Sequence, residues 1–158
     1  MAELLADKII LRIGEASELY YRLILLVAPI GAGKTAALQD VHERLVVPLI
    51  NVNLELSRRM LHLTELQRAL QLPHLLAEIV GAFATEVVLL DNIEILFDIS
   101  LKQDSVRLLK GLSRSKTVVA AWSGSVDGDH IVYAIPNHPE YRRDFIRDFL
   151  VANPKALE

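Results

Sequence analysis

The fold of this chain is decided by the stretch Ala28-Pro29-Ile30-Gly31-Ala32-Gly33-Lys34-Thr35. The apolar run Leu23-Ile24-Leu25-Leu26-Val27 precedes it and is typical of a buried parallel strand. A helical pattern follows it and extends from Ala36 to Leu45. A strand, a glycine-rich loop that ends in Gly-Lys-Thr, and a helix form the local structure in which this motif binds phosphate. The stretch therefore predicts a phosphate-binding loop.

The predicted loop offers phosphate several favourable groups. Its glycines let backbone N–H groups converge on phosphate oxygens, and the following helix N-terminus adds partial positive charge. Lys34 is expected to reach the outer phosphates and Thr35 to hold Mg²⁺. The strict pattern begins with glycine where this chain has Ala28, which can serve if that position needs no positive φ. The predicted nucleotide-binding residues are Pro29, Ile30, Gly31, Ala32, Gly33, Lys34, Thr35 and Ala36.

Length, composition and charge restrict the class of protein. The 158 residues predict one globular domain over 1–158, with an N-terminal helix at 2–19 and a core at about 20–151. The chain has no cysteine, which excludes a disulfide framework or a thiolate metal site. Its net charge of −3 provides no chain-wide attraction for nucleic acid or membrane. The N-terminus lacks the order of a signal peptide, so we expect a cytoplasmic protein that does not span a membrane.

Apolar runs and helical patterns alternate along the chain. Strands are expected at about 21–27, 46–53, 86–91, 117–122 and 130–135, and helices at 2–19, 36–45, 54–82, 100–112 and 139–151. This alternation predicts a three-layer α/β fold with a mainly parallel, five-stranded sheet and no C-terminal helical lid. Too few residues join the last two strands for a helical crossover. The fifth strand is therefore expected either to run antiparallel at the sheet edge or to follow a loop that crosses the sheet.

Individual residues mark the expected helix ends. Thr64 with Gln67, and Ser100 with Gln103, have the spacing of capping boxes. Pro73 is expected to start, kink or divide a helix, and His138 before Pro139 is typical of a helix start. Trp122 ends an apolar strand and is expected in the core.

Polar residues are predicted to gather at one edge of the sheet. Ala28, Asn53, Asp91 and Ser123 all fall at the ends of predicted strands, and ligands bind beyond the carboxyl ends of parallel strands. Asp91 follows four apolar residues, so its carboxylate is expected to hold Mg²⁺ opposite Thr35. The alternative is an aspartate that caps a turn or helix at the strand end.

The chain resembles the P-loop ATPases of the additional-strand class, which includes AAA+ and RecA-like proteins. The resemblance lies in residues 28–35, a strand near 46–53, and Val87 to Asp91. More closely, the chain is similar to the BrxF family, the small P-loop proteins of type 3 BREX phage-defence systems, in residues 20–26, 51–59, 89–94 and 133–141. This resemblance implies an ATPase, with ATP and Mg²⁺ as cofactors, that works as a switch or assembly subunit in bacterial antiviral defence. The implied partners are further copies of the chain, a methyltransferase and other defence subunits.

Two glutamates compete for the role of orienting the attacking water. Many additional-strand ATPases carry a glutamate directly after the metal-binding aspartate, but this chain has Asn92 there. Glu94 lies three positions beyond Asp91, and Glu55 follows the second strand, where RecA-like and rotary ATPases place a catalytic glutamate. Ser123 matches the position of a polar sensor in this class. The expected catalytic residues are Lys34, Glu55, Glu94 and Ser123.

Several arginines and lysines form local basic groups. Arg107, Lys110 and Arg114 share one predicted helix face. The segment predicted as the last helix carries Arg142, Arg143, Asp144, Arg147 and Asp148. Solvated charges are the common meaning of such patterns. The functional alternatives are a weak DNA-backbone patch or an arginine finger that reaches the nucleotide of a neighbouring protomer, for which Arg114 and Arg143 are the preferred candidates.

Three functions remain open on the sequence. The first is an ATP-hydrolysing switch that needs an oligomer or partner for full activity. The second is a nucleotide-responsive scaffold with little catalysis, favoured by Asn92 and by the absence of a lid segment after residue 151. The third is a small-molecule kinase built on the same loop, which would need an acceptor pocket and a lid.

Overall fold

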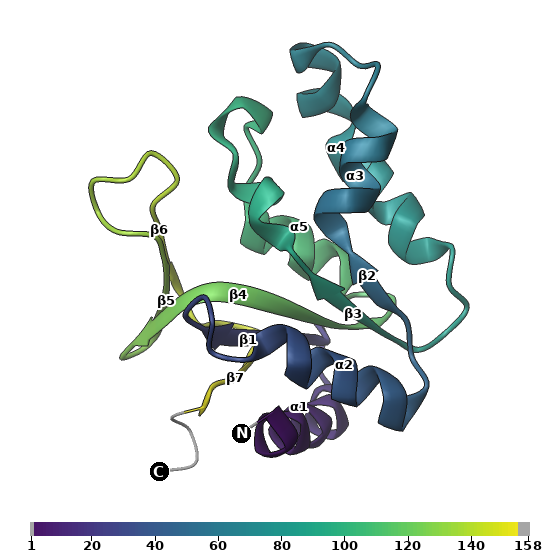
Figure 1. Ribbon diagram of the computed structural model, residues 1–158, viewed down its shortest axis with the longest axis vertical. Coiled ribbons are helices and arrows are strands. Elements are labelled where there is room, and N and C mark those ends of the chain that lie inside the picture. Colours follow the sequence, from purple (N-terminus) through teal and green to yellow (C-terminus); the bar gives the residue numbers. More distant parts are fainter. Residues whose placement is uncertain (1, 155–158) are drawn as a thin grey trace.

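The protein is an α/β structure in which helices cover both faces of a mostly parallel sheet (Figure 1). The computed structural model describes residues 2–154, and side chains over residues 4–154. The helices are α1 (Ala2–Ala16), α2 (Lys34–Leu45), α3 (Val52–Met60), α4 (Glu65–Gly81) and α5 (Ser105–Leu112), with short 3-10 helices η1 (Ile93–Phe97) and η2 (Ile99–Leu101). The strands are β1 (Leu23–Ala28), β2 (Leu49–Asn51), β3 (Val87–Asp91), β4 (Thr117–Asp127), β5 (His130–Tyr133), β6 (Arg142–Phe145) and β7 (Leu150–Ala152).

Five parallel strands form the body of the sheet in the order β2-β3-β4-β1-β7. The first four predicted strands are confirmed as parallel neighbours, but the sheet has seven strands and not the predicted five, and the fifth parallel strand is β7 and not the segment at 130–135. That segment is β5, which pairs antiparallel with the far end of β4. The antiparallel alternative for it is therefore confirmed. β6 pairs antiparallel with β5 and extends this smaller arm of the sheet, away from the parallel body.

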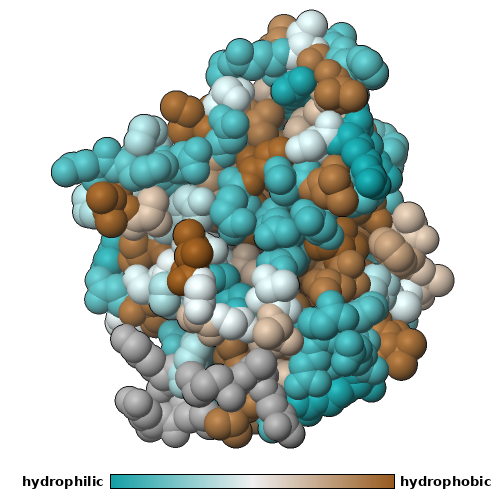
Figure 2. Space-filling view, in the orientation of Figure 1, coloured by the Kyte–Doolittle hydropathy of each residue, from teal (hydrophilic) through white to brown (hydrophobic). Residues whose placement is uncertain are grey.

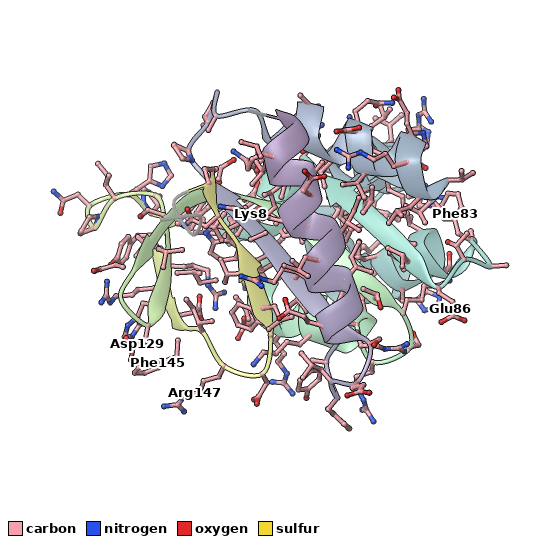
Figure 3. The ribbon with its side chains drawn as sticks, turned by 90° about the horizontal axis from the view of Figure 1, so that it is seen from below. Lys8, Phe83, Glu86, Asp129, Phe145 and Arg147 are labelled. Atoms are coloured by element: carbon pink, nitrogen blue, oxygen red, sulfur yellow. The ribbon has the colours of Figure 1, made fainter. Side chains whose placement is uncertain are left out.

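The two faces of the sheet bury separate apolar cores. Leu23, Leu25 and Val27 of β1 face α3, α4 and α5, whereas Ile24 and Leu26 face α1 and α2. Seen from the α1 side, that helix lies across β1 and β7 (Figure 3). Every residue of β1 is buried, as expected for a parallel strand that is covered on both faces. No helix within residues 2–154 is long and apolar enough to cross a membrane.

The predicted C-terminal helix at 139–151 is wrong. Residues 142–145 and 150–152 are strands, and the backbone N–H of Glu140 donates to Nδ1 of His138 in a turn. The charges alternate with the period of a strand. Arg142 and Asp144 pair with each other on one side of β6, and Arg143 pairs at 2.7 Å with Asp127 of β4, on the far side of β5.

The start of α5 also differs from the prediction. Ser100 lies in η2, where both its N–H and its hydroxyl donate to Asp98 Oδ1. The N-cap of α5 is Asp104, whose carboxylate accepts from the backbone N–H of Arg107 at 3.1 Å. Charge at a helix N-terminus favours Asp104 as the cap, because its carboxylate complements the unpaired N–H groups better than the serine hydroxyl four positions earlier.

Residue Gln103 has a different role from the predicted cap. Helix α4 begins at the confirmed capping box of Thr64 and Gln67 and continues through Pro73. Pro73 has no N–H to donate to the carbonyl of Ala69, one turn earlier. The side-chain amide of Gln103 donates to that carbonyl at 2.7 Å and to the carbonyl of Leu101 at 2.6 Å. A side chain from another part of the chain thus replaces the missing helical hydrogen bond.

The second predicted strand is shorter than expected. β2 ends at Asn51, whose side chain accepts from the backbone N–H of Leu54 and caps α3. Asn53 therefore lies in α3 and not at a strand end. The turn that joins α3 to α4 projects away from the sheet, although both helices pack on it through their buried faces (Figure 1). Figure 2 shows hydrophobic side chains on the surface of this helix pair, and Leu61, Leu66 and Leu70 are 66%, 67% and 72% exposed.

Trp122 is buried in the core, as predicted. Its ring contacts Phe97 and Tyr133 edge-to-face, and its indole N–H donates to the carbonyl of Val132 at 3.1 Å. Gly124 makes this approach of β4 and β5 possible, because a Cβ there would lie 1.9 Å from the same carbonyl oxygen. Close packing, and not a positive φ, requires glycine at this position.

We expect Gln103→Ala to lower the free energy of unfolding by about 1 kcal/mol, because the carbonyl of Ala69 loses its donor. The cost should shrink in a Pro73→Ala background, where residue 73 regains an N–H that can bond that carbonyl. Urea unfolding of the two single variants and the double variant measures this coupling. Equal costs of Gln103→Ala in both backgrounds would contradict the proposed replacement of the helical bond.

Candidate functional site

The loop between β1 and α2 has the backbone that the sequence predicts. Gly31 and Gly33 adopt φ values of +82° and +89°, which only glycine adopts readily. Ala28 is not among the described residues with a positive φ, so alanine meets the condition set for the first loop position. Gly33 is the N-cap of α2, which begins at Lys34. The chain therefore turns directly from a buried strand into a helix whose N-terminus points back over the strand end.

The side chain of Lys34 folds back onto the loop that precedes α2. Its Nζ donates to the backbone carbonyls of Ala28 at 3.0 Å and Pro29 at 2.9 Å, and its side chain is largely buried. Burial lowers the pKa of the Lys34 ammonium, while the charges of Glu94 and Asp91 partly oppose this by favouring the charged form. The loop thus holds a desolvated cation close to two carboxylates.

Thr35 and Asp91 meet at the base of the cavity. The Thr35 hydroxyl donates to Asp91 Oδ2 at 2.8 Å, and Asp91 Oδ1 accepts from the N–H of Asn92 at 2.9 Å. A hydroxyl and a carboxylate are oxygen ligands of the kind that Mg²⁺ prefers. The described residues contain no group of three or more His, Cys, Asp or Glu side chains that could hold a metal. A magnesium ion here would take its remaining ligands from phosphate and water.

Glu94 and Ser123 form a second pair beside the first. Glu94 lies on η1, directly after β3, and Ser123 lies in β4, opposite Ala28 of β1 in the register. The Ser123 hydroxyl donates to Glu94 Oε2 at 3.3 Å. This carboxylate therefore has a fixed neighbour on the strand that lies between β1 and β3.

The two pairs and the loop line one cavity of about 490 Å³ at the carboxyl ends of β1, β3 and β4. Its lining residues are Ile30, Gly31, Gly33, Lys34, Thr35, Ala36, Asp91, Asn92, Glu94 and Ser123. The cavity is open to solvent and bordered by one ammonium, two carboxylates and two hydroxyls. Such an arrangement offers both hydrogen-bond donors and acceptors to a polar ligand.

Some predicted site residues lie elsewhere. Glu55 is on α3, where its carboxylate pairs with Arg59 at 2.8 Å and Arg58 at 3.4 Å, and it does not line the cavity. Pro29 and Ala32 line a neighbouring, more apolar cavity on the other side of the loop. The structure therefore brings Glu94, and not Glu55, together with Lys34, Asp91 and Ser123.

The two arginines considered as fingers also lie outside the cavity. The Arg114 guanidinium stacks over the ring of Tyr20 at 4.9 Å from its centroid. Arg143 is held by Asp127 on the β4–β5–β6 arm. Neither side chain completes the cavity of its own chain.

Asn92 has a role that the sequence did not reveal. It adopts φ +54°, which turns the chain sharply after β3, and its carbonyl accepts from the N–H of Asn53 at 3.1 Å. This turn brings Glu94 back to the cavity. The signal in the sequence is the asparagine itself, because asparagine tolerates the left-handed region better than other residues with side chains.

We expect Glu94→Gln and Asp91→Asn each to lower the pKa of Lys34 further, because each removes a negative charge that favours the ammonium. The effect of Glu94→Gln should be the larger. NMR titration of the lysine ¹³Cε resonances, with Lys34 assigned through Lys34→Arg, measures the shift. Glu55→Gln is the matched control and should leave the titration unchanged, and a response equal to that of Glu94→Gln would contradict the geometry.

Sequence comparison finds no match to this chain among protein-family models or among curated proteins. The functional argument therefore depends on the geometry of the cavity. Its main elements are the buried ammonium of Lys34, the Thr35–Asp91 pair and the Glu94–Ser123 pair.

Proposed function

We propose that the chain binds ATP with Mg²⁺ in this cavity and hydrolyses it, as a P-loop ATPase of the additional-strand class. The observation that carries the proposal is the convergence of three groups from separate strands. Lys34 follows β1, Asp91 ends β3 and Ser123 lies in β4, and all three line one cavity. A parallel sheet with β4 inserted between β1 and β3 supports the class, because the resemblance implies such an inserted strand.

The first task of the site is to neutralise the triphosphate. The Lys34 ammonium would exchange its two carbonyl acceptors for phosphate oxygens, which are stronger, charged acceptors. The N–H groups of the loop and the N-terminus of α2 add favourable partial charges. Thr35 and Asp91 are the residues that would hold Mg²⁺, which neutralises the outer phosphates when bound.

The second task is to attack the terminal phosphate. We assign the orientation of the attacking water to Glu94, because it lines the cavity and Glu55 does not. The water oxygen forms a bond to the terminal phosphorus while the bond to the bridging oxygen breaks, which releases ADP and phosphate. The Glu94 carboxylate accepts a hydrogen bond from this water, and the Ser123 hydroxyl holds the carboxylate in place.

The biological setting proposed here follows from the resemblance to the BrxF family. The chain would act as an ATP-driven switch or assembly subunit in antiviral defence, as a homo-oligomer or with other defence subunits. Arg114 and Arg143 lie outside the cavity of their own chain. An arginine finger, if the activity uses one, would therefore come from a neighbouring protomer or partner.

We expect Lys34→Ala to weaken ATP binding roughly ten- to a hundredfold, because a charged hydrogen-bond donor to the phosphates is lost. Isothermal titration calorimetry with Mg²⁺ present measures the affinity. Arg58→Ala removes one positive charge from α3, outside the cavity, and is the control for net charge. Equal affinity of wild type and Lys34→Ala would refute the proposed nucleotide site.

Turnover distinguishes the two glutamates. We expect Glu94→Gln to reduce phosphate release about a hundredfold while ATP affinity is retained, because the carboxylate acts on water and not on nucleotide. Glu55→Gln should keep wild-type turnover. The reverse pattern would move the water-orienting role to Glu55. Tight ATP binding by wild type without phosphate release would favour the scaffold function, and transfer to a small hydroxyl acceptor would favour a kinase.

A further inference from the structure

A second cleft, of about 450 Å³, lies between α5 and the segment that joins β6 to β7. We call it the basic cleft, because four of its lining residues are cations. They are Arg107, Lys110, Arg114 and Arg147. Figure 3 shows Arg147 beside Phe145, where the chain leaves β6 and continues toward β7.

The basic cleft lies at the opposite end of the sheet from the phosphate loop. Its lining residues Tyr21, Arg114 and Arg147 lie two or three positions before β1, β4 and β7, which are neighbouring parallel strands. They therefore lie at the amino ends of these strands. The phosphate loop follows Ala28, at the carboxyl end of β1. The two sites share no lining residue and can be tested separately.

Aromatic rings hold three of the four cations in place. The Lys110 ammonium lies 5.5 Å from the ring centre of Tyr21 and 5.6 Å from that of Phe149. Arg114 lies over Tyr20 at 4.9 Å, and Arg147 lies over Phe145 at 4.5 Å. Such contacts restrict long, flexible side chains. A ligand that binds these cations therefore loses less conformational entropy than one that must order free lysines and arginines.

The two carboxylates that line the basic cleft share one guanidinium, so together they set only a small negative charge against the four cations of the cleft. Asp104 and Asp144 both pair with Arg142, at 2.9 Å and 2.8 Å. Over residues 4–154, for which side chains are described, none of the four cleft cations pairs with a carboxylate. The basic cleft thus concentrates positive charge on a chain whose net charge is −3. Positive charge concentrated in a concave surface attracts a polyanion.

We propose that the basic cleft binds the phosphodiester backbone of a nucleic acid. Several fixed cations that line one cleft can contact successive phosphates of a backbone, whereas a single phosphate group would not need so many. Arginine is especially suited to phosphate because its guanidinium donates in a planar fork. The aromatic rings beside the cleft are already in contact with its cations and are therefore not free to stack on bases. We therefore expect the cleft to recognise the charge of the backbone and not the base sequence. This site goes beyond the proposed ATPase activity and does not depend on it.

Fluorescence anisotropy with a short labelled oligonucleotide at low salt tests the proposal, with a single strand and its duplex as separate arms. We expect Lys110→Ala/Arg114→Ala to weaken binding roughly tenfold and to reduce the slope of log affinity against log salt by about 1.4 for a single strand. Arg58→Ala/Arg59→Ala removes the same charge from α3 and should leave affinity and slope unchanged. Arg107→Ala, whose side chain makes none of the ring contacts described, is a second cleft variant that should weaken binding in the same direction.

Three results would overturn the proposal. They are absence of binding to both nucleic-acid forms at low salt, equal weakening by the cleft and α3 variants, and tighter binding of a polyglutamate peptide of matched charge. The last result would assign the basic cleft to an acidic protein. Lys34→Ala should bind the oligonucleotide as wild type does, so failure of the ATP site and failure of the basic cleft give different patterns.

Discussion

Parallel pairing of β1, β4 and β3 is the constraint on which the candidate site depends. Register sets Ala28 beside Ser123, and the pairing of β3 with β4 brings Asp91 to the same edge of the sheet. Three segments that are far apart in the sequence thus end at one cavity. Parallel strands need cover on both faces, which α1 and α2 provide on one side and α3, α4 and α5 on the other. The two apolar cores therefore hold the polar site together.

The cavity combines opposing electrostatic effects. Burial disfavours the charged form of Lys34, and the two nearby carboxylates favour it. In this structure the Lys34 ammonium donates hydrogen bonds to the loop carbonyls of Ala28 and Pro29. A site arranged in this way keeps a cation and its neighbouring anions close together, in an arrangement that a ligand with more negative charge can displace.

Much of this architecture could be predicted from local patterns, because continuous apolar runs and a glycine-rich turn act within a few residues. The glycine-rich turn between β1 and α2, the strands β1, β3 and β4, the capping box at Thr64 and the core position of Trp122 belong to this class. The segment after residue 138 could not be predicted, because its charges fit both helical and strand spacing until β5 provides a partner. The role of Glu94 depends on the left-handed turn at Asn92, and that of Gln103 on a contact across the fold.

The bond between Gln103 and the carbonyl of Ala69 links two positions that would otherwise vary independently. With proline at position 73 this carbonyl needs a donor from position 103, whereas any other residue at 73 would supply the helical N–H itself. Natural variants should therefore lose the glutamine only together with the proline or after it. The missing backbone N–H of one proline would in this way restrict the order in which the two positions can change.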